Sequence, residues 1–398
     1  MYNIFNRDRI LSNVLLLACT LMLLGHNLFD RKVLFIVFCT FLIASIKDHQ
    51  IIVNGIKSNI PLISVLLWCG LSATWSRWPL DTVEETLIQT MMFLTCLLIS
   101  TKLSSDKIYQ VLFHSAIIVI SINLLYIVIF FNASISSDGM NSLYNHKNNF
   151  GLIMALCSIF ILNSGRCNRS KLVLVFFIIS IVLLFASLSK TSISLFFISI
   201  ILGYCFSSSF FKINFNAYVP LLMFLLTLTI FLSLVVVYYR FNILDYFYYN
   251  INEDFLTGRG KLWITMILHA ENYLITGFGF NSVWGKGEWS EVYDTELYLH
   301  SPLWVEVLAA SDGGYIDIII SLGIIGFFLF LLYIADTLVK VLMLNDTKSK
   351  FFMLSILIFA VLHNITETTF LLSTNVIWFL FLLITNLTIT KNSRWLNV

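Results

Sequence analysis

Charge is scarce in this sequence, and its scarcity excludes a soluble globular protein. Only 12% of the 398 residues are charged, whereas 59% are hydrophobic and the mean hydropathy is +0.89. A soluble domain has about 25% charged residues. Apolar runs recur to the end of the chain, which also excludes a soluble domain with a single anchor. The composition predicts a polytopic membrane protein, and a net charge of +2 does not indicate nucleic-acid binding.

The sequence also lacks the motifs of metal, nucleotide and nucleophile sites. His269 and His300 have no ligand partners at zinc spacing, and there is no Asp-rich calcium loop. Gly277–Gly279 lacks the strand-then-helix setting of a dinucleotide loop, and no Gly-x-Ser-x-Gly elbow is present. Every cysteine except Cys167 lies in an apolar run, which argues against a disulfide framework. We therefore expect neither a metal nor a cofactor.

The apolar runs predict an all-α fold with about twelve transmembrane helices. Several runs are shorter than the roughly 20 residues that cross the hydrocarbon, so polar flanks must complete those helices. Ile10–Leu24 follows Arg7 and Arg9 without a small-residue cleavage site, so we interpret it as the first transmembrane helix rather than a signal peptide. The predicted helices cover residues 10–28, 32–46, 58–74, 86–101, 110–131, 149–164, 171–188, 192–211, 217–238, 314–337, 351–365 and 370–390.

These runs divide the chain into three parts. Residues 1–237 hold the first nine predicted helices, residues 238–313 form one large polar loop, and residues 314–398 hold the last three. With the N-terminus in the cytoplasm, most lysines and arginines of the short segments fall on the cytoplasmic side, as the positive-inside rule requires. This distribution predicts that both termini are cytoplasmic and that the large loop is external.

Basic residues are the minority on the predicted outer side. Four of them lie next to predicted helices: Lys147, Lys190, Arg240 and Arg259. Each one alone fits a side chain that snorkels to the membrane interface. Together, cations at the depth of the headgroups suit the phosphate or pyrophosphate of a lipid, which Arg binds with two parallel hydrogen bonds and Lys with a point charge.

Acidic residues accompany these cations where the large loop re-enters the membrane. Asp312 precedes two glycines, which let the backbone approach another group closely. A carboxylate there can accept a proton from a hydroxyl. The alternative is that Asp312 caps the following helix, because Asp is a favoured N-cap residue. Asp317, one turn further on, and Glu367, in the last outer loop, are expected to pair with the cations.

Short motifs spread over most of the length give the chain a family resemblance. Their order and spacing carry the likeness more than any one of them does. On these motifs the chain resembles the bacterial O-antigen ligase/polymerase superfamily, and within it the O-antigen and exopolysaccharide polymerases. The motifs are Ser72–Ser76 with Pro79, His146–Asn148, Ser187–Thr191, Thr257–Arg259 with Trp263, Thr276–Gly279, Gly314–Asp317 with Gly323–Gly326, and Thr366–Glu367 with Asn375 and Trp378.

The resemblance implies a GT-C-like glycosyltransferase in the bacterial inner membrane with a periplasmic active site. Its donor would be a glycan on undecaprenyl pyrophosphate, held by outer arginines, and transfer would invert the anomeric carbon without a metal. His146 and Asn148 become substrate-binding candidates through the same resemblance. The chain departs from the family pattern twice. Lys190 stands where the turn often has Arg, and Asp312-Gly313 stands where ligases have His-Asn before Gly-Tyr.

Three functions remain open at this stage. The first is a polymerase, in which Arg259 with Lys190, Arg240 and Lys147 neutralises the leaving pyrophosphate while Asp312 deprotonates a second lipid-linked repeat unit. Flippase and chain-length regulator proteins would be its partners. The second is a ligase that transfers finished polymer to lipid A core or to a protein. The third is a polysaccharide or sugar transporter, which spans almost free of charge do not favour.

Overall fold

The structure is a computed structural model that describes residues 2–25, 28–163, 171–208, 250 and 258–395. Its regular structure is almost entirely helical, with a short hairpin that pairs β1 (Ile135–Ser136) with β2 (Gly139–Met140). The α-helices are α1 (Tyr2–Leu24), α2 (Arg31–Ser45), α3 (His49–Lys57), α4 (Ile60–Leu71), α5 (Pro79–Lys102), α6 (Ser105–Ile129), α7 (Lys147–Leu162), α8 (Lys171–Ala186), α9 (Lys190–Ser207), α12 (Arg259–His269), α13 (Glu296–His300), α14 (Pro302–Val305), α15 (Gly314–Leu342), α16 (Thr347–Thr366) and α17 (Val376–Trp395).

Several of these helices are suited to a membrane. Within the described residues, six helical segments are long and apolar enough to cross it: Arg31–Lys57, Pro79–Lys102, Ser105–Ile129, Lys190–Ser207, Gly314–Leu342 and Thr347–Thr366. Shorter apolar helices cover Ile60–Thr74, Lys147–Leu162, Lys171–Ala186 and Val376–Ile389. Each predicted helix in the described ranges coincides with an observed one, although the ends are shifted. The predicted helix 217–238 and Arg240 lie outside the described residues, and α3 was not predicted.

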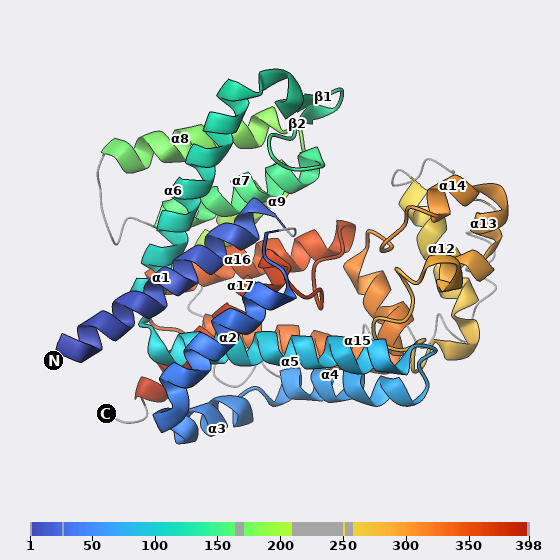
Figure 1. Cartoon of the computed structure of the whole chain (residues 1–398), viewed down its shortest axis with the longest axis horizontal. Coiled ribbons are helices and arrows are strands. Elements are labelled where there is room, and N and C mark those ends of the chain that lie inside the picture. The colour runs from blue at the N-terminus through green and yellow to red at the C-terminus, as the bar shows by residue number, and fades with distance from the viewer. Residues whose placement is uncertain (1, 26–27, 164–170, 209–249, 251–257, 396–398) are drawn as a thin grey trace.

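The helices pack into a bundle that carries α12, α13 and α14 at one end (Figure 1). The helix α15 packs against α4 and α16, α16 packs against α9, and α1 packs against α6. In Figure 1, α1 begins and α17 ends on the left, opposite α12–α14. The aromatic side chains of Phe330, Tyr333, Phe370, Trp378 and Phe381 fill the space between α15 and α17, with centroids 5.1 Å apart for Phe370 and Phe381. Such ring pairs add to the apolar burial.

The helix α15 is broken at Gly323, which has φ 69° and ψ −176°. Residues 274–279, here called the loop insert, supply the hydrogen bonds that the break removes from the helix. The amide of Phe278 donates to the Ile320 carbonyl at 3.0 Å, and the amide of Ile324 donates to the Leu274 carbonyl at 2.9 Å. A Cβ at Gly277 would overlap the carbonyl of Ser321, so only glycine permits this approach. The Thr276–Gly279 and Gly323–Gly326 motifs therefore form one clamp.

The Ser72–Ser76 motif and its neighbours hold the loop insert and the chain that follows it. The hydroxyl of Ser72 accepts a hydrogen bond from the amide of Phe280 at 2.9 Å, and Thr82 donates to the Phe280 carbonyl at 2.6 Å. The indole of Trp75 donates to the Gly277 carbonyl at 3.1 Å, and that of Trp68 to the Leu322 carbonyl at 2.8 Å. These contacts hold the large loop against the bundle. They also give hydrogen-bond partners to backbone groups that would otherwise be buried without them.

Candidate active site

Arg259 is the first residue of α12 and directly follows a residue in the left-handed conformation. Gly258, at the N-cap position, has φ 87°. The guanidinium donates to the Thr366 carbonyl at 2.6 Å and to the carboxylates of Asp312 and Glu367, both at 3.2 Å. Its side chain is 23% exposed, so it is not fully enclosed by the protein. Arg259, Asp312, Glu367 and Asn148, which bonds to Glu367, are called the Arg259 cluster below.

Asp312 reaches this cluster through an uncommon backbone conformation. Its φ is 53°, a left-handed value that non-glycine residues adopt with strain. The N-cap of α15 is Gly313, and no side-chain hydrogen bond caps that helix. The alternative that Asp312 serves as the cap is therefore wrong. Its carboxylate bonds to Arg259 instead and is 49% exposed.

The two glycines after Asp312 let the chain pass between close neighbours. A Cβ at Gly313 would lie 2.7 Å from the indole ring of Trp263, and one at Gly314 would overlap the side chain of Asn364. The indole nitrogen of Trp263 donates to the Ser311 carbonyl at 2.8 Å. These contacts explain Trp263 and the start of the Gly314–Asp317 motif, because α12 and the start of α15 are fitted to each other without room for a methyl group. Thr257 lies outside the described residues.

Glu367 follows the last residue of α16 and joins the two halves of the molecule. It accepts a hydrogen bond from the side-chain amide of Asn148, near the start of α7, at 3.1 Å. Asn148 in turn accepts from the hydroxyl of Ser189, in the turn before α9, at 3.1 Å. Burial raises the pKa of Glu367, the charge of Arg259 lowers it, and the charge of Asp312 raises it again; the net shift is upward. Glu367 was predicted to pair with a cation, and in the structure it pairs with Arg259.

His146, Lys147 and Lys190 are neighbours in the sequence of Asn148 and Ser189, which belong to this network. His146 caps α7 by accepting the amide of Asn148 at 3.2 Å, and Lys147 donates its ammonium to the Asp138 carbonyl at 3.0 Å. Lys190 begins α9 directly after Ser189, and its side chain is exposed. Arg240 lies outside the described residues. Arg259 is thus the predicted cation that bonds to the predicted carboxylates, while Lys147 and Lys190 adjoin the residues that support it.

Asp317 has different partners from those expected. It is buried, and its carboxylate accepts hydrogen bonds from the indole of Trp284 at 2.9 Å, the amide of Ser311 at 3.1 Å and the hydroxyl of Thr368. The hydrogen bonds found for it among the described residues come from neutral donors, so the expectation of a cation partner is wrong for this residue. Its role is to tie the start of α15 to the loop on one side and to the residue after Glu367 on the other.

A cavity of about 420 Å³ lies beside Asp317 and Thr368; it is called the polar cavity below because charged side chains line it, although most of its wall is apolar. Arg31, Glu85 and Lys286 add charged groups to its wall, and the indole of Trp284 adds an aromatic ring. Arg31 pairs with Glu85 at 2.8 Å, and Lys286 pairs with Asp81. The volume lies in the range of ligand pockets, about 300–1,000 Å³. Thr368, which lines the cavity, directly follows Glu367 of the Arg259 cluster in the sequence.

A second ionic group lies in the large loop away from these residues. His269, Glu291 and Asp294 have ligand atoms within 4.8 Å of one another, a grouping that spacing along the sequence did not reveal. The guanidinium of Arg77 lies 3.7 Å from Glu291 and 3.6 Å from Asp294 and stacks over Trp289. Arg77 already supplies positive charge to both carboxylates, so the group works as an ion-pair link between the early outer loop and the large loop.

Sequence reasoning missed several residues of this region. Arg31 was not among the candidate site residues, because its pairing with Glu85 joins helices far apart in the sequence and has no local signal. Gln89, in the middle of α5, accepts the Trp378 indole at 2.8 Å and donates to the Leu371 carbonyl. His363 is buried one turn before Glu367. A polar residue inside an apolar run is the signal that Gln89 and His363 share.

The fold and the site together define a polytopic membrane protein with an arginine–carboxylate cluster where its loop helices meet the bundle. The family model described as O-antigen ligase matches residues 174–331. This confirms that the chain is related to the O-antigen ligase/polymerase superfamily. No curated protein sequence matches the chain.

The matched region contains part of the site. It includes Arg259, Asp312 and Asp317, together with both halves of the clamp at Gly323, whereas Asn148 and Glu367 lie outside it. Members of this family are glycosyltransferase-like enzymes that handle lipid-linked oligosaccharides. The match is equally compatible with a polymerase and with a ligase, and it gives the transporter alternative no support.

Proposed function

We propose that the protein is an O-antigen or exopolysaccharide polymerase that transfers a glycan from undecaprenyl pyrophosphate to another lipid-linked repeat unit. The observation that carries the proposal is the placement of Arg259 between Asp312 and Glu367 beside a polar cavity. A fixed guanidinium suits a pyrophosphate, and an adjacent carboxylate suits the proton of an attacking hydroxyl. Both groups are needed for inverting transfer from a lipid-linked donor.

The proposed reaction is a single displacement. The acceptor hydroxyl loses its proton to Asp312, and its oxygen forms a bond to the anomeric carbon of the donor. The bond from that carbon to the pyrophosphate oxygen breaks, and the electron pair leaves with the lipid pyrophosphate. Arg259 stabilises the developing charge, with Lys190, Lys147 and Arg240 as the further cations of the site. His146, Asn148, Asp317 and Glu367 position these groups and the substrate.

The ion pairs that Arg259 makes in the structure are compatible with this reaction. Two carboxylates hold Arg259 when no phosphate is present, so the guanidinium is already oriented. Asp312, at 49% exposure, is the carboxylate that a pyrophosphate can replace at Arg259 most easily, whereas Glu367 is 22% exposed and also held by Asn148. When the pyrophosphate replaces it at Arg259, the carboxylate of Asp312 is free to accept the hydrogen bond of the acceptor hydroxyl, which is what a general base requires.

The polar cavity is the proposed place for the acceptor sugar. Hydroxyl groups of a glycan suit the charged side chains of Arg31, Glu85 and Lys286, and the ring of Trp284 offers an apolar surface. The proposed setting is the bacterial inner membrane, with both termini cytoplasmic and this site periplasmic. A flippase would deliver the donor, and a chain-length regulator would act on the product.

A ligase is the second candidate, because the family description of the matching region is O-antigen ligase. It uses the same donor and passes finished polymer to lipid A core or to a protein. Deleting the gene separates the two. Loss of a polymerase leaves single repeat units on the final acceptor, whereas loss of a ligase leaves polymer on the lipid carrier.

Replacing Arg259 tests the proposal. We expect Arg259→Ala to abolish long polymer on a gel, with activity lower by about 10²–10³-fold, because one charge-stabilising donor is lost. Arg259→Lys should restore a part of it, since charge returns without the bidentate geometry. Arg77→Ala is the matched control, because Arg77 lies in the other ionic group. Normal polymer length in Arg259→Ala would rule out the assigned role.

A further inference from the structure

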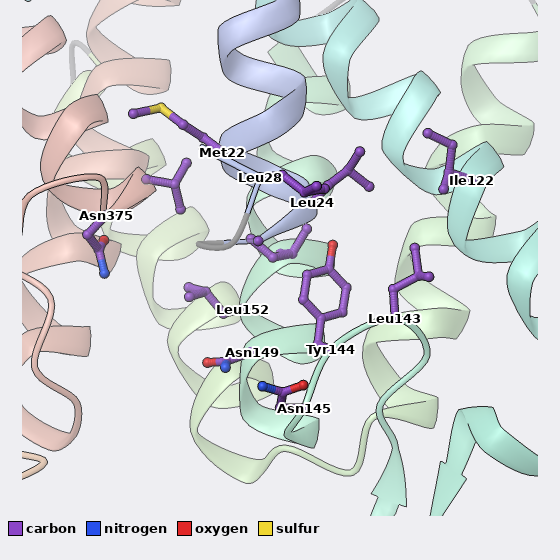
Figure 2. Close-up of a pocket in the computed structure, with 13 residues that line it drawn as sticks. Met22, Leu24, Leu28, Ile122, Leu143, Tyr144, Asn145, Asn149, Leu152 and Asn375 are labelled. Carbon is purple, nitrogen blue, oxygen red and sulfur yellow. The ribbon is translucent and has the colours of Figure 1, made fainter. Parts of the chain in front are cut away.

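Two cavities of similar volume differ in the charge of their walls. The second cavity, of about 460 Å³, lies between the end of α1, the later part of α6, the start of α7 and the start of α17 (Figure 2). Apolar side chains form most of its wall, together with the amides of Asn145, Asn149 and Asn375, and none of the described residues that line it is charged. Two basic and two acidic side chains line the polar cavity instead. A ligand that is distinguished by its charge therefore fits the polar cavity.

Both cations of the polar cavity are already paired with carboxylates. The guanidinium of Arg31 donates to Glu84 and Glu85, at 2.8 Å in the second case. The ammonium of Lys286 donates to Asp81, and the Lys286 side chain is only 11% exposed. An anionic ligand can reach either cation only by displacing one of these carboxylates, and that displacement costs an ion pair. The wall thus offers no ready site for an acid.

Carboxylates also outnumber cations around this cavity. Glu85 and Asp317 line the wall, and Asp81 and Glu84 belong to the two ion pairs. Even without the buried Asp317, three carboxylates stand against two cations. The summed charge gives the cavity a negative potential, which repels a ligand that carries a carboxylate of its own.

Neutral polar groups of the same wall remain for a ligand. Asn281 and Ser373 line the cavity, and no hydrogen-bond partner is found for either side chain among the described residues. An amide and a hydroxyl can both donate to and accept from sugar hydroxyls. The ring of Trp284 adds an apolar surface for the face of a pyranose. The groups left open therefore suit an uncharged sugar.

We infer that the polar cavity selects an acceptor sugar without acidic groups, and that Glu84 and Asp81 set this selectivity by occupying the cations of the wall. The inference rests on the proposed function, in which this cavity holds the acceptor, and it adds the chemical class of the accepting sugar. The enzyme would elongate a repeat unit whose accepting sugar is neutral and discriminate against the same unit with a uronic acid at that position.

Two acceptors of the same shape and different charge test this inference. One is a lipid-linked oligosaccharide that ends in glucuronic acid, and the other ends in glucuronamide, in which an uncharged amide replaces the carboxylate. Purified full-length protein receives one lipid-linked donor and an equal mixture of both acceptors, and mass spectrometry measures the ratio of the two elongated products. Because the ratio is internal to each sample, it does not depend on the amount of folded protein.

The variants remove or add a single carboxylate. Glu84→Gln and Asp81→Asn each release a cation of the polar cavity from one carboxylate, and the native side chains are 62% and 44% exposed, so both changes are expected to leave the fold intact. The matched control is Asn145→Asp, which adds a carboxylate to the second cavity at an exposed position.

The wild type should elongate the amide acceptor about fivefold more than the acid, which is the effect of one partly exposed charge contact. The ratio should fall towards one in Glu84→Gln and Asp81→Asn, remain at the wild-type value in Asn145→Asp, and decrease at high salt, because salt screens exposed charges. A wild-type ratio at or below one, or an unchanged ratio in both polar-cavity variants, would overturn the inference. Elongation of either acceptor by the wild type would leave the proposed function intact in that case.

A different outcome separates the proposed function from the selectivity of the cavity. If the wild type elongates neither acceptor, the result counts against the proposed function, and binding then tests the inference alone. Saturation-transfer NMR with the full-length protein compares the methyl glycosides of glucuronic acid and glucuronamide. A stronger signal from the amide that becomes equal to that of the acid in Glu84→Gln supports the inference. Equal signals in the wild type, or a stronger signal from the acid, overturn it.

Discussion

The two ends of the first half of α15 differ in how their polar groups are satisfied. At Gly323 the loop insert bonds to the broken helix through neutral backbone groups, and the glycines leave no space for a Cβ. At the start of the helix, Asp312 sits in a strained conformation and shares Arg259 with Glu367 in a half-exposed position. The first region is complete without a ligand, whereas the second has charges that a ligand can rearrange.

This difference distinguishes residues that hold the fold together from residues that can take part in a reaction, although both kinds occur in similar motifs. Gly-rich motifs occur in both regions, so their presence alone does not distinguish them. What distinguishes them is charge combined with exposure, because groups poised for reaction must be reachable and must be able to change partners. Perturbing each region should therefore affect stability in one and activity in the other.

The largest effect should come from the break in α15. In Gly323→Ala a Cβ would overlap the carbonyl of Ile275 while the residue keeps a positive φ, so we expect little folded protein in detergent. Gly285→Ala is the matched control, since Gly285 has φ 72° and open space around it. The control should lose only about 1 kcal/mol of stability. Equal thermal stability of the two variants would show that the clamp is not essential.

The next largest effect should come from Asp312, and it should be on activity. Asp312→Asn keeps the size of the side chain and removes the base, so we expect polymerisation to fall by about 10²–10⁴-fold. Asp312→Gly should be similarly inactive but more stable by about 1 kcal/mol, because glycine relieves the positive φ. Polymer assays and thermal unfolding in detergent measure the two effects. An inactive but destabilised Asp312→Gly would indicate that Asp312 has a structural role.

Glu367 should give the protein a pH-dependent stability. Its folded-state pKa is raised, mainly by burial, so the folded protein holds the proton more tightly than the unfolded chain does. The contribution of Glu367 to the free energy of unfolding is fully present below the ordinary carboxyl pKa. It is lost as the pH rises through the raised pKa of the folded state. Glu367→Gln should flatten this decline in thermal stability between acid and neutral pH. Glu84→Gln is the control, because that carboxylate is 62% exposed. An unchanged decline in Glu367→Gln would contradict the assignment.

The smallest effect should come from Thr368. Thr368→Val removes one of the hydrogen bonds to Asp317 while the indole of Trp284 and the amide of Ser311 remain. We expect a loss of about 1 kcal/mol in stability and a change of only a few-fold in activity. Thr90→Val on α5 provides a comparison, since that hydroxyl bonds within its own helix. A loss as large as that of Arg259→Ala would place Asp317 in the catalytic chemistry.

The sequence predicted the helical class and the positions of most helices, because long apolar runs have few alternatives in a membrane. It also singled out Arg259, Asp312 and Glu367, since charges are rare among such runs, and the structure brings these three together. The partners of Asp317 and the pairing of Arg31 with Glu85 were not predictable. They depend on how helices distant in the sequence pack, and local patterns carry no information about that. The ionic group around His269 was missed for the same reason.

The insertion of residues 274–279 into α15 has a practical consequence for anyone who wishes to study the large loop as a separate fragment. Cut away from the bilayer portion, Phe278 and Gly279 would lose the acceptors of their amide hydrogens, and Leu274 would lose the donor to its carbonyl. Such a fragment would expose unpaired backbone groups that are hydrogen-bonded in the intact protein. Antibodies raised against it would then recognise a surface that the intact protein does not expose.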